Sequence, residues 1–128
     1  MVRSKPNFFW AVFWSFFILL VCFAPSKGIP KFSFFANWHI DKCIHFFLFF
    51  IQALLFLLIK DDKKRFYREN TFNYILFVVF YCLFLGLSVE LIQHFFIETR
   101  AGDFMDFTAD VLGAITALIL FRNKKVVV

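Results

Sequence analysis

Four long apolar segments constrain the fold of this chain more than any other feature. They cover residues 8–24, 40–59, 72–97 and 104–121, and most polar residues lie between them. A helix of about 17–25 residues crosses the hydrocarbon core of a bilayer. A soluble domain of 128 residues cannot hide a composition that is 62% hydrophobic and includes 24 phenylalanines. The sequence therefore predicts an all-α membrane protein, with residues 1–128 forming a single four-transmembrane-helix bundle.

The first apolar segment has a second interpretation, as a cleaved signal peptide. Arg3 and Lys5 precede the apolar run, and Cys22 lies where a lipoprotein signal would be cleaved. The run is long for a signal peptide, however, and Val21 occupies the position where a small residue is typical. We therefore expect a retained first helix.

The distribution of basic residues predicts the orientation. Most of the 14 Lys and Arg residues lie before the first segment, between the second and third, or after the fourth. Short loops rich in Lys and Arg stay on the cytoplasmic side. We therefore expect both termini in the cytoplasm and a multi-pass protein of the bacterial cytoplasmic (inner) membrane. The net charge of +5 is explained by this arrangement, and no nucleic-acid partner is expected.

Polar side chains gather at the opposite, extracytoplasmic end of the predicted bundle. In a helix, residues three, four and seven apart share one face. Three such faces carry ionisable or amide groups: Asp41, His45 and Gln52 in the second segment; Glu90, Gln93 and His94 in the third; Asp103, Asp106 and Asp110 in the fourth. Convergence of these faces would enclose a polar pocket that opens outward.

The fourth segment also carries small residues on its polar face. Ala109, Gly113 and Ala117 form a small-xxx-small series, which marks close approach between membrane helices. The carboxylate face is therefore also the predicted packing face.

Several of these residues have simpler structural explanations. Asp103 and Asp41 suit the first turn of a helix, where Asp103 would accept the amide of Asp106, and Lys42 suits a side chain that reaches to the headgroups. Glu90 and Asp110 lie about 10 Å from the nearer ends of their segments, too deep for capping. For these two and Asp106 the alternative is a polar network that only sets helix register.

Clustered carboxylates in a low-dielectric site need cations beside them. Arg100, His45, Lys42 and His94 are the available partners, and Arg100 is the strongest because its planar guanidinium holds a carboxylate with two hydrogen bonds. We therefore predict an ion pair between Arg100 and either Asp106 or Glu90.

The order and spacing of these residues resemble the VanZ-like family of small bacterial membrane proteins. The residues that carry the resemblance are Asp41-Lys42-x-x-His45, Glu90-x-x-Gln93, Arg100, Asp103-x-x-Asp106 and Gly113. The family pattern has Asn at the position of Asp110, so this chain places an additional carboxylate there. The resemblance implies a role in the cell envelope, and the family's founding member is associated with resistance to glycopeptide antibiotics of the teicoplanin type.

Two classes of function fit this pattern. The first is a binding module for an amphiphile, such as a lipid-linked cell-wall precursor, a lipid headgroup or a lipoglycopeptide. Its expected ligand-binding residues are Asp41, His45, Glu90, Gln93, Arg100, Asp103, Asp106 and Asp110. The second is an intramembrane enzyme that uses Glu90 or Asp106, assisted by His45, as general acid or base on a lipid or peptidoglycan substrate.

No compact metal-binding spacing is present. A metal set would have to combine residues from separate segments, such as His45, His94, Glu90 and Asp106, and the three cysteines are widely spaced. We therefore expect neither a metal nor another cofactor. The expected partners are membrane lipids, a cell-wall precursor or glycopeptide antibiotic, and a second copy of the chain.

Overall fold

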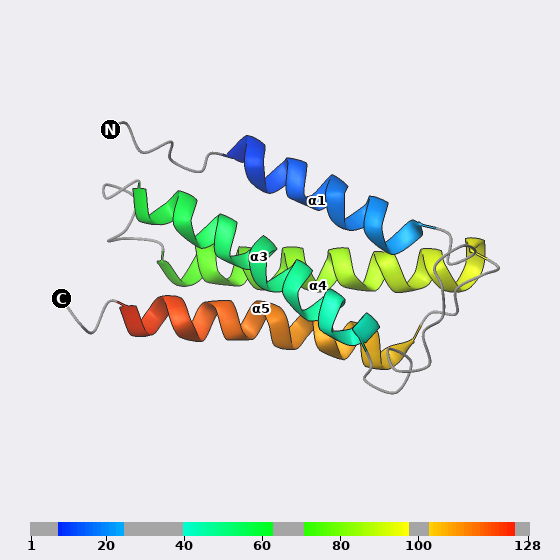
Figure 1. The fold of residues 1–128 in the computed structure, drawn as a ribbon. Coiled ribbons are helices and arrows are strands. Elements are labelled where there is room, and N and C mark those ends of the chain that lie inside the picture. Colours follow the sequence, from blue (N-terminus) through cyan, green and yellow to red (C-terminus); the bar gives the residue numbers. More distant parts are fainter. Residues whose placement is uncertain (1–7, 25–39, 63–70, 98–102, 125–128) are drawn as a thin grey trace.

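The four apolar segments form four helices in the described part of the chain, which comprises residues 8–24, 40–62, 71–97 and 103–124 of the computed structural model (Figure 1). The helices are α1 (Phe8–Phe23), α3 (Ile40–Asp62), α4 (Thr71–Phe96) and α5 (Phe104–Lys124). No strand occurs among these residues. The prediction of an all-α membrane protein with a four-helix bundle is confirmed, whereas the cytoplasmic location of the termini stays a prediction.

Three of the helices are long and apolar enough to cross a membrane. Their apolar stretches are Ile40–Ile59, Phe72–Phe96 and Phe104–Phe121. Helix α1 is also apolar but has 16 residues, so it is about 24 Å long and shorter than a bilayer core. Large apolar side chains such as Phe16, Phe80 and Phe84 cover the outer surface and are more than 60% exposed. Such a surface suits lipid, and the protein is a multi-pass membrane protein.

The helices run in alternating directions, with α3 packing most closely on α5 and also touching α1 and α4 (Figure 1). The C-terminal ends of α1 and α4 therefore meet the N-terminal ends of α3 and α5 at one end of the bundle, on the right in Figure 1. We call this the site end, because the polar residues singled out in the sequence lie there.

Gly113 sets the distance between α3 and α5. A Cβ atom at this position would lie 2.1 Å from the backbone oxygen of Phe46, so only glycine allows the observed approach. Ala109 and Ala117, one turn to either side, are buried. The predicted role of the small-residue series in helix packing is confirmed.

Polar side chains tie α1 to the rest of the bundle. Ser15 Oγ donates to Gln52 Oε1 on α3 at 3.0 Å and lies 2.7 Å from the hydroxyl of Tyr81 on α4. The indole of Trp14 donates to the carbonyl oxygen of Leu48 at 2.9 Å. These contacts position the short helix against α3 and α4, and they explain why Gln52 is buried far from the site end.

Candidate functional site

Six polar side chains from three helices meet at the site end. Lys42 and His45 lie in the first two turns of α3, Glu90 lies in the last two turns of α4, and Asp103, Asp106 and Asp110 lie before and within the first two turns of α5. His45 and Asp110 are each 1% exposed, Asp106 is 4% exposed and Glu90 is 8% exposed. We call these six residues the polar cluster.

His45 lies at the centre of the polar cluster. Its Nδ1 is 2.9 Å from Oδ1 of Asp110, a hydrogen bond, and 4.0 Å from Oε1 of Glu90. Its other ring nitrogen, Nε2, is 3.9 Å from Oδ2 of Asp106. One imidazole thus faces carboxylates from α4 and α5, because the Gly113 contact holds α3 and α5 close together. Each of the three helix faces that the sequence picked out thus contributes at least one residue here, namely His45, Glu90 and Asp110, whereas Gln52, Gln93 and His94 lie elsewhere.

Lys42 is a cation that reaches the carboxylates of α5. Its Nζ donates to Oδ2 of Asp103 at 2.9 Å and to Oδ1 of Asp106 at 3.2 Å. The side chain is 25% exposed and its ammonium group contacts these carboxylates, so Lys42 has a role within the cluster, whereas its contact with lipid headgroups stays a prediction. Arg100 lies outside the described residues, so the ion pair expected for it stays a prediction.

Asp103 caps α5 and links it to α4. Its Oδ1 accepts the backbone N–H of Met105 at 2.9 Å, while its own backbone N–H donates to Oε2 of Glu90 at 2.8 Å. The predicted capping role is confirmed, but the capped amide is that of Met105, because the amide of Asp106 donates to the backbone oxygen of Asp103. Glu90 therefore satisfies a backbone amide that a helix N-terminus leaves without an intrahelical acceptor.

Two buried carboxylate oxygens of the cluster have no hydrogen-bond partner among the described residues. They are Oε1 of Glu90 and Oδ2 of Asp110. An unpaired polar atom in a buried position costs about 1–3 kcal/mol, and more when it is charged. Among the described residues, the hydrogen bonds of the cluster therefore leave two buried acceptor oxygens unpaired.

Gly86 belongs to the site, although the sequence reasoning missed it. A Cβ atom at Gly86 would lie 3.0 Å from Oδ2 of Asp110, so the absence of a side chain on α4 leaves room for this carboxylate. Gly86 is four residues before Glu90 and shares its helix face. This four-residue spacing is the feature of the sequence that indicates Gly86.

The other predicted site residues lie at the margin of the cluster. Gln93 is buried but donates to the backbone oxygen of Cys22 at 2.7 Å, which gives it a part in holding α1. Asp41 and His94 are exposed. One oxygen of Asp41 still lies within 4.8 Å of ligating atoms of His45 and Asp106.

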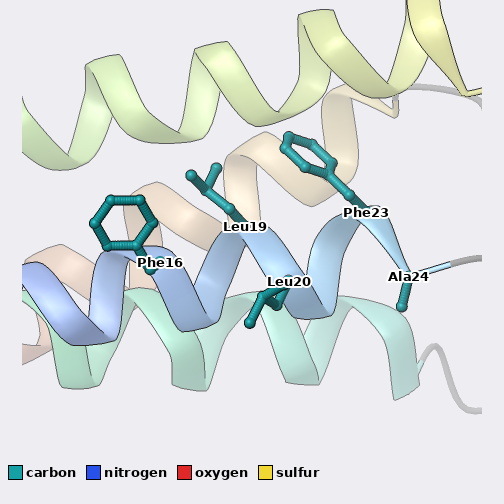
Figure 2. A pocket seen from close by; sticks show the side chains of 5 residues that line it. All are labelled: Phe16, Leu19, Leu20, Phe23 and Ala24. Atoms are coloured by element: carbon teal, nitrogen blue, oxygen red, sulfur yellow. The ribbon is translucent and has the colours of Figure 1, made fainter.

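A hollow of about 390 Å³ lies along the last two turns of α1 (Figure 2). Its lining is entirely apolar and consists of Phe16, Leu19, Leu20, Phe23 and Ala24. These side chains offer no acid, base or hydrogen-bonding group, so the hollow suits hydrocarbon. Gln93 contacts α1 beside it, at Cys22, which places the hollow toward the site end.

The fold and the polar cluster define a small multi-pass membrane protein with a buried carboxylate–histidine site at one end of its helix bundle. The family model for VanZ/LLP1 matches residues 3–126. The chain belongs to this family, as its motifs indicated.

A comparison with curated proteins adds one relative from a eukaryote. An uncharacterized protein of the fission yeast Schizosaccharomyces pombe is 32% identical over 111 residues, which cover 82% of this chain. The matched part spans 59% of that relative's length. No solved structure matches the chain. The relative's origin shows that similarity of this kind extends beyond bacteria.

Proposed function

We propose that the protein binds the headgroup of an amphiphile at the polar cluster. The observation that carries the proposal is the continuity of the cluster from a partly exposed rim to a buried centre. At the rim, the side chains of Lys42 and Asp103 are 25% and 44% exposed, and at the centre that of Asp110 is 1% exposed. A headgroup can therefore meet charged groups without leaving the interface between lipid and water.

The charges at the rim favour a zwitterionic headgroup. Lys42 offers an ammonium group to a phosphate, while Asp41 and Asp103 offer carboxylates to an amine. The apolar hollow on α1 supports the second half of the proposal, because an acyl chain can lie along Phe16, Leu20 and Phe23 while the headgroup occupies the rim. A phospholipid with an ethanolamine headgroup has both parts, and so does an amine-bearing lipid-linked cell-wall precursor or a lipoglycopeptide.

The cellular role that we attach to this binding follows the family resemblance. We place the protein in the bacterial cytoplasmic membrane with the polar cluster on the extracytoplasmic side, where such amphiphiles are available. Binding there would reduce sensitivity to glycopeptide antibiotics of the teicoplanin type by engaging either the drug or its lipid-linked target.

Native mass spectrometry tests the binding. The full chain is released from nanodiscs that contain phosphatidylethanolamine and phosphatidylglycerol in equal amounts. We expect retained phosphatidylethanolamine on the wild type and a clear loss of that adduct in Lys42→Gln, which removes the rim cation. Thr116→Ala is the matched control, because Thr116 donates to the backbone oxygen of Leu112 in its own helix, on the exposed face of α5. Equal lipid retention in all three proteins would refute the proposal.

The geometry of His45 favours acid–base catalysis as a second candidate. An imidazole that is hydrogen-bonded to one carboxylate and lies about 4 Å from two others is oriented as a general base would be. A purified protein that turns over a lipid or peptidoglycan substrate, and loses this turnover in Glu90→Gln, would favour catalysis. Stoichiometric binding without turnover would favour the binding module.

A further inference from the structure

We propose that His45, Glu90 and Asp110 bind a divalent transition-metal ion of the zinc or manganese class. Each of the three residues comes from a different helix, and their ligand atoms all lie within 4.8 Å of one another. All three side chains are at least nine-tenths buried. The metal would therefore join α3, α4 and α5 at the buried centre of the polar cluster.

The distances among the three residues fit one metal ion with small adjustments. Zinc lies about 2.1 Å from imidazole nitrogen and from carboxylate oxygen, so two ligand atoms on a tetrahedral ion are about 3.4 Å apart. Nδ1 of His45 is 2.9 Å from Oδ1 of Asp110 and 4.0 Å from Oε1 of Glu90, and these values bracket that spacing. Side-chain rotations that move the atoms by less than about 1 Å would complete the site.

The two unpaired oxygens are an independent observation that points to a cation. Oε1 of Glu90 and Oδ2 of Asp110 are buried and accept no hydrogen bond from the described residues. The room for Oδ2 is provided by Gly86, which has no side chain to cover it. Buried charges in proteins are paired or coordinate metals. One divalent cation bound to Oε1 of Glu90 and Oδ1 of Asp110 would pair the first of these oxygens and neutralise both carboxylates.

The surroundings of His45 also match those of a metal-binding histidine. Such residues use one ring nitrogen for the metal and donate the other N–H to a carboxylate or another acceptor, which fixes the ring and raises its basicity. With Nδ1 on the metal, Nε2 of His45 faces Oδ2 of Asp106 at 3.9 Å, and Lys42 in turn holds the other oxygen of Asp106. Asp106 would thus be the residue that orients the ligand.

The donor set selects the kind of metal. Imidazole suits zinc and carboxylates suit manganese or magnesium, while affinity rises from manganese to zinc in the Irving–Williams order. We therefore expect zinc to bind more tightly than manganese, and magnesium to compete poorly. This proposal departs from the sequence-based expectation of no metal, because three ligands on three separate helices leave no spacing motif. It does not rest on headgroup binding, for which the named contacts are Lys42, Asp41 and Asp103 at the rim.

Metal analysis of the purified full chain in nanodiscs tests the proposal. The protein is stripped with a chelator, incubated with zinc chloride or manganese chloride, separated from free ion and measured by elemental mass spectrometry. We expect about one zinc per chain, since three protein ligands and a water complete one tetrahedral site. Glu90→Gln and Asp110→Asn should each weaken zinc binding at least about tenfold, and Asp106→Asn about 10–100-fold, as is typical for residues that orient a ligand.

Thr116→Ala is the control, because Thr116 donates to the backbone oxygen of Leu112 in its own helix and lies outside the polar cluster. It should retain zinc binding. X-ray absorption at the zinc edge of the wild type gives a measurement that needs no variant, and one nitrogen and two carboxylate oxygens near 2.1 Å are expected. Metal content at the level of empty nanodiscs would overturn the proposal. So would a site that is lost in Asp41→Asn and retained in Glu90→Gln, since the ligands would then be Asp41, His45 and Asp106.

Discussion

Replacement of Gly113 by alanine should separate α3 from α5 and disrupt the polar cluster. The new Cβ atom would lie 2.1 Å from the backbone oxygen of Phe46, whereas ordinary contact begins at 3.4 Å. The obstacle is backbone, which cannot rotate away as a side chain can. The two helices must therefore move apart by about 1.3 Å at this level, or α5 must tilt by an equivalent amount.

The cost of this movement follows from general magnitudes. Overpacking of a tight core costs about 1–3 kcal/mol, and the higher helix propensity of alanine offsets about 1 kcal/mol of that. The net loss in free energy of unfolding is therefore up to about 2 kcal/mol. Asp110 is only one turn away, so the hydrogen bond between His45 and Asp110 would stretch to roughly 4 Å, beyond hydrogen-bonding range.

Gly86→Ala is the matched comparison for Gly113→Ala. At Gly86 the new Cβ atom would meet Oδ2 of Asp110 at 3.0 Å, which is the end of a side chain and moves by a few tenths of an ångström. Both variants can be unfolded in mixed micelles by increasing the fraction of sodium dodecyl sulfate, with helicity followed by circular dichroism. We expect Gly113→Ala to unfold at a lower fraction than Gly86→Ala. If the two variants unfold together, close packing at Gly113 does not hold the helices at this distance.

Three further predictions concern the site end. Lys42→Met should lower the free energy of unfolding by about 1–2 kcal/mol, because Asp106 stays buried and loses its ion pair with Lys42. The loss is moderate because the lysine side chain is partly exposed. The same micelle titration measures this loss. Gln93→Leu should remove the bond to Cys22, cost about 0.6–2 kcal/mol and increase proteolysis of α1. A membrane-impermeant maleimide should label exposed Cys43 in intact cells only if the site end faces outward, and Cys43→Ser provides the blank.

The sequence predicted the helices and the faces that carry the polar cluster because both follow from periodicity. Apolar runs of membrane-spanning length left few alternatives to helices, and the i, i+3, i+7 spacing of Asp103, Asp106 and Asp110 placed them on one face. Gly113 indicated which face would pack, since small residues mark close helix contacts. These inferences depend on residues within one segment, where helical geometry is sufficient.

Helical periodicity does not show which side chains of different segments pair with each other. The choice of Asp110 as the partner of His45, and of Lys42 as the partner of Asp106, depends on the relative height and rotation of α3 and α5. A shift of one helical turn would give different pairs with the same face pattern. Gly86 shares the helix face of Glu90, but its role depends on a carboxylate from another helix, and the spacing alone did not show that role.

The position of the polar cluster along the bundle bears on whether the protein binds a ligand or conducts ions. His45 and Gln52 lie on the same face of α3 but are seven residues apart, which is about 10 Å along the helix. Phe49 lies between them and is fully buried. Gln52 turns toward α1, where it accepts from Ser15 and donates to the backbone oxygen of Ala11. Among the described residues, the buried ring of Phe49 thus separates the two polar layers, and an ion that passed from one layer to the other would have to cross it.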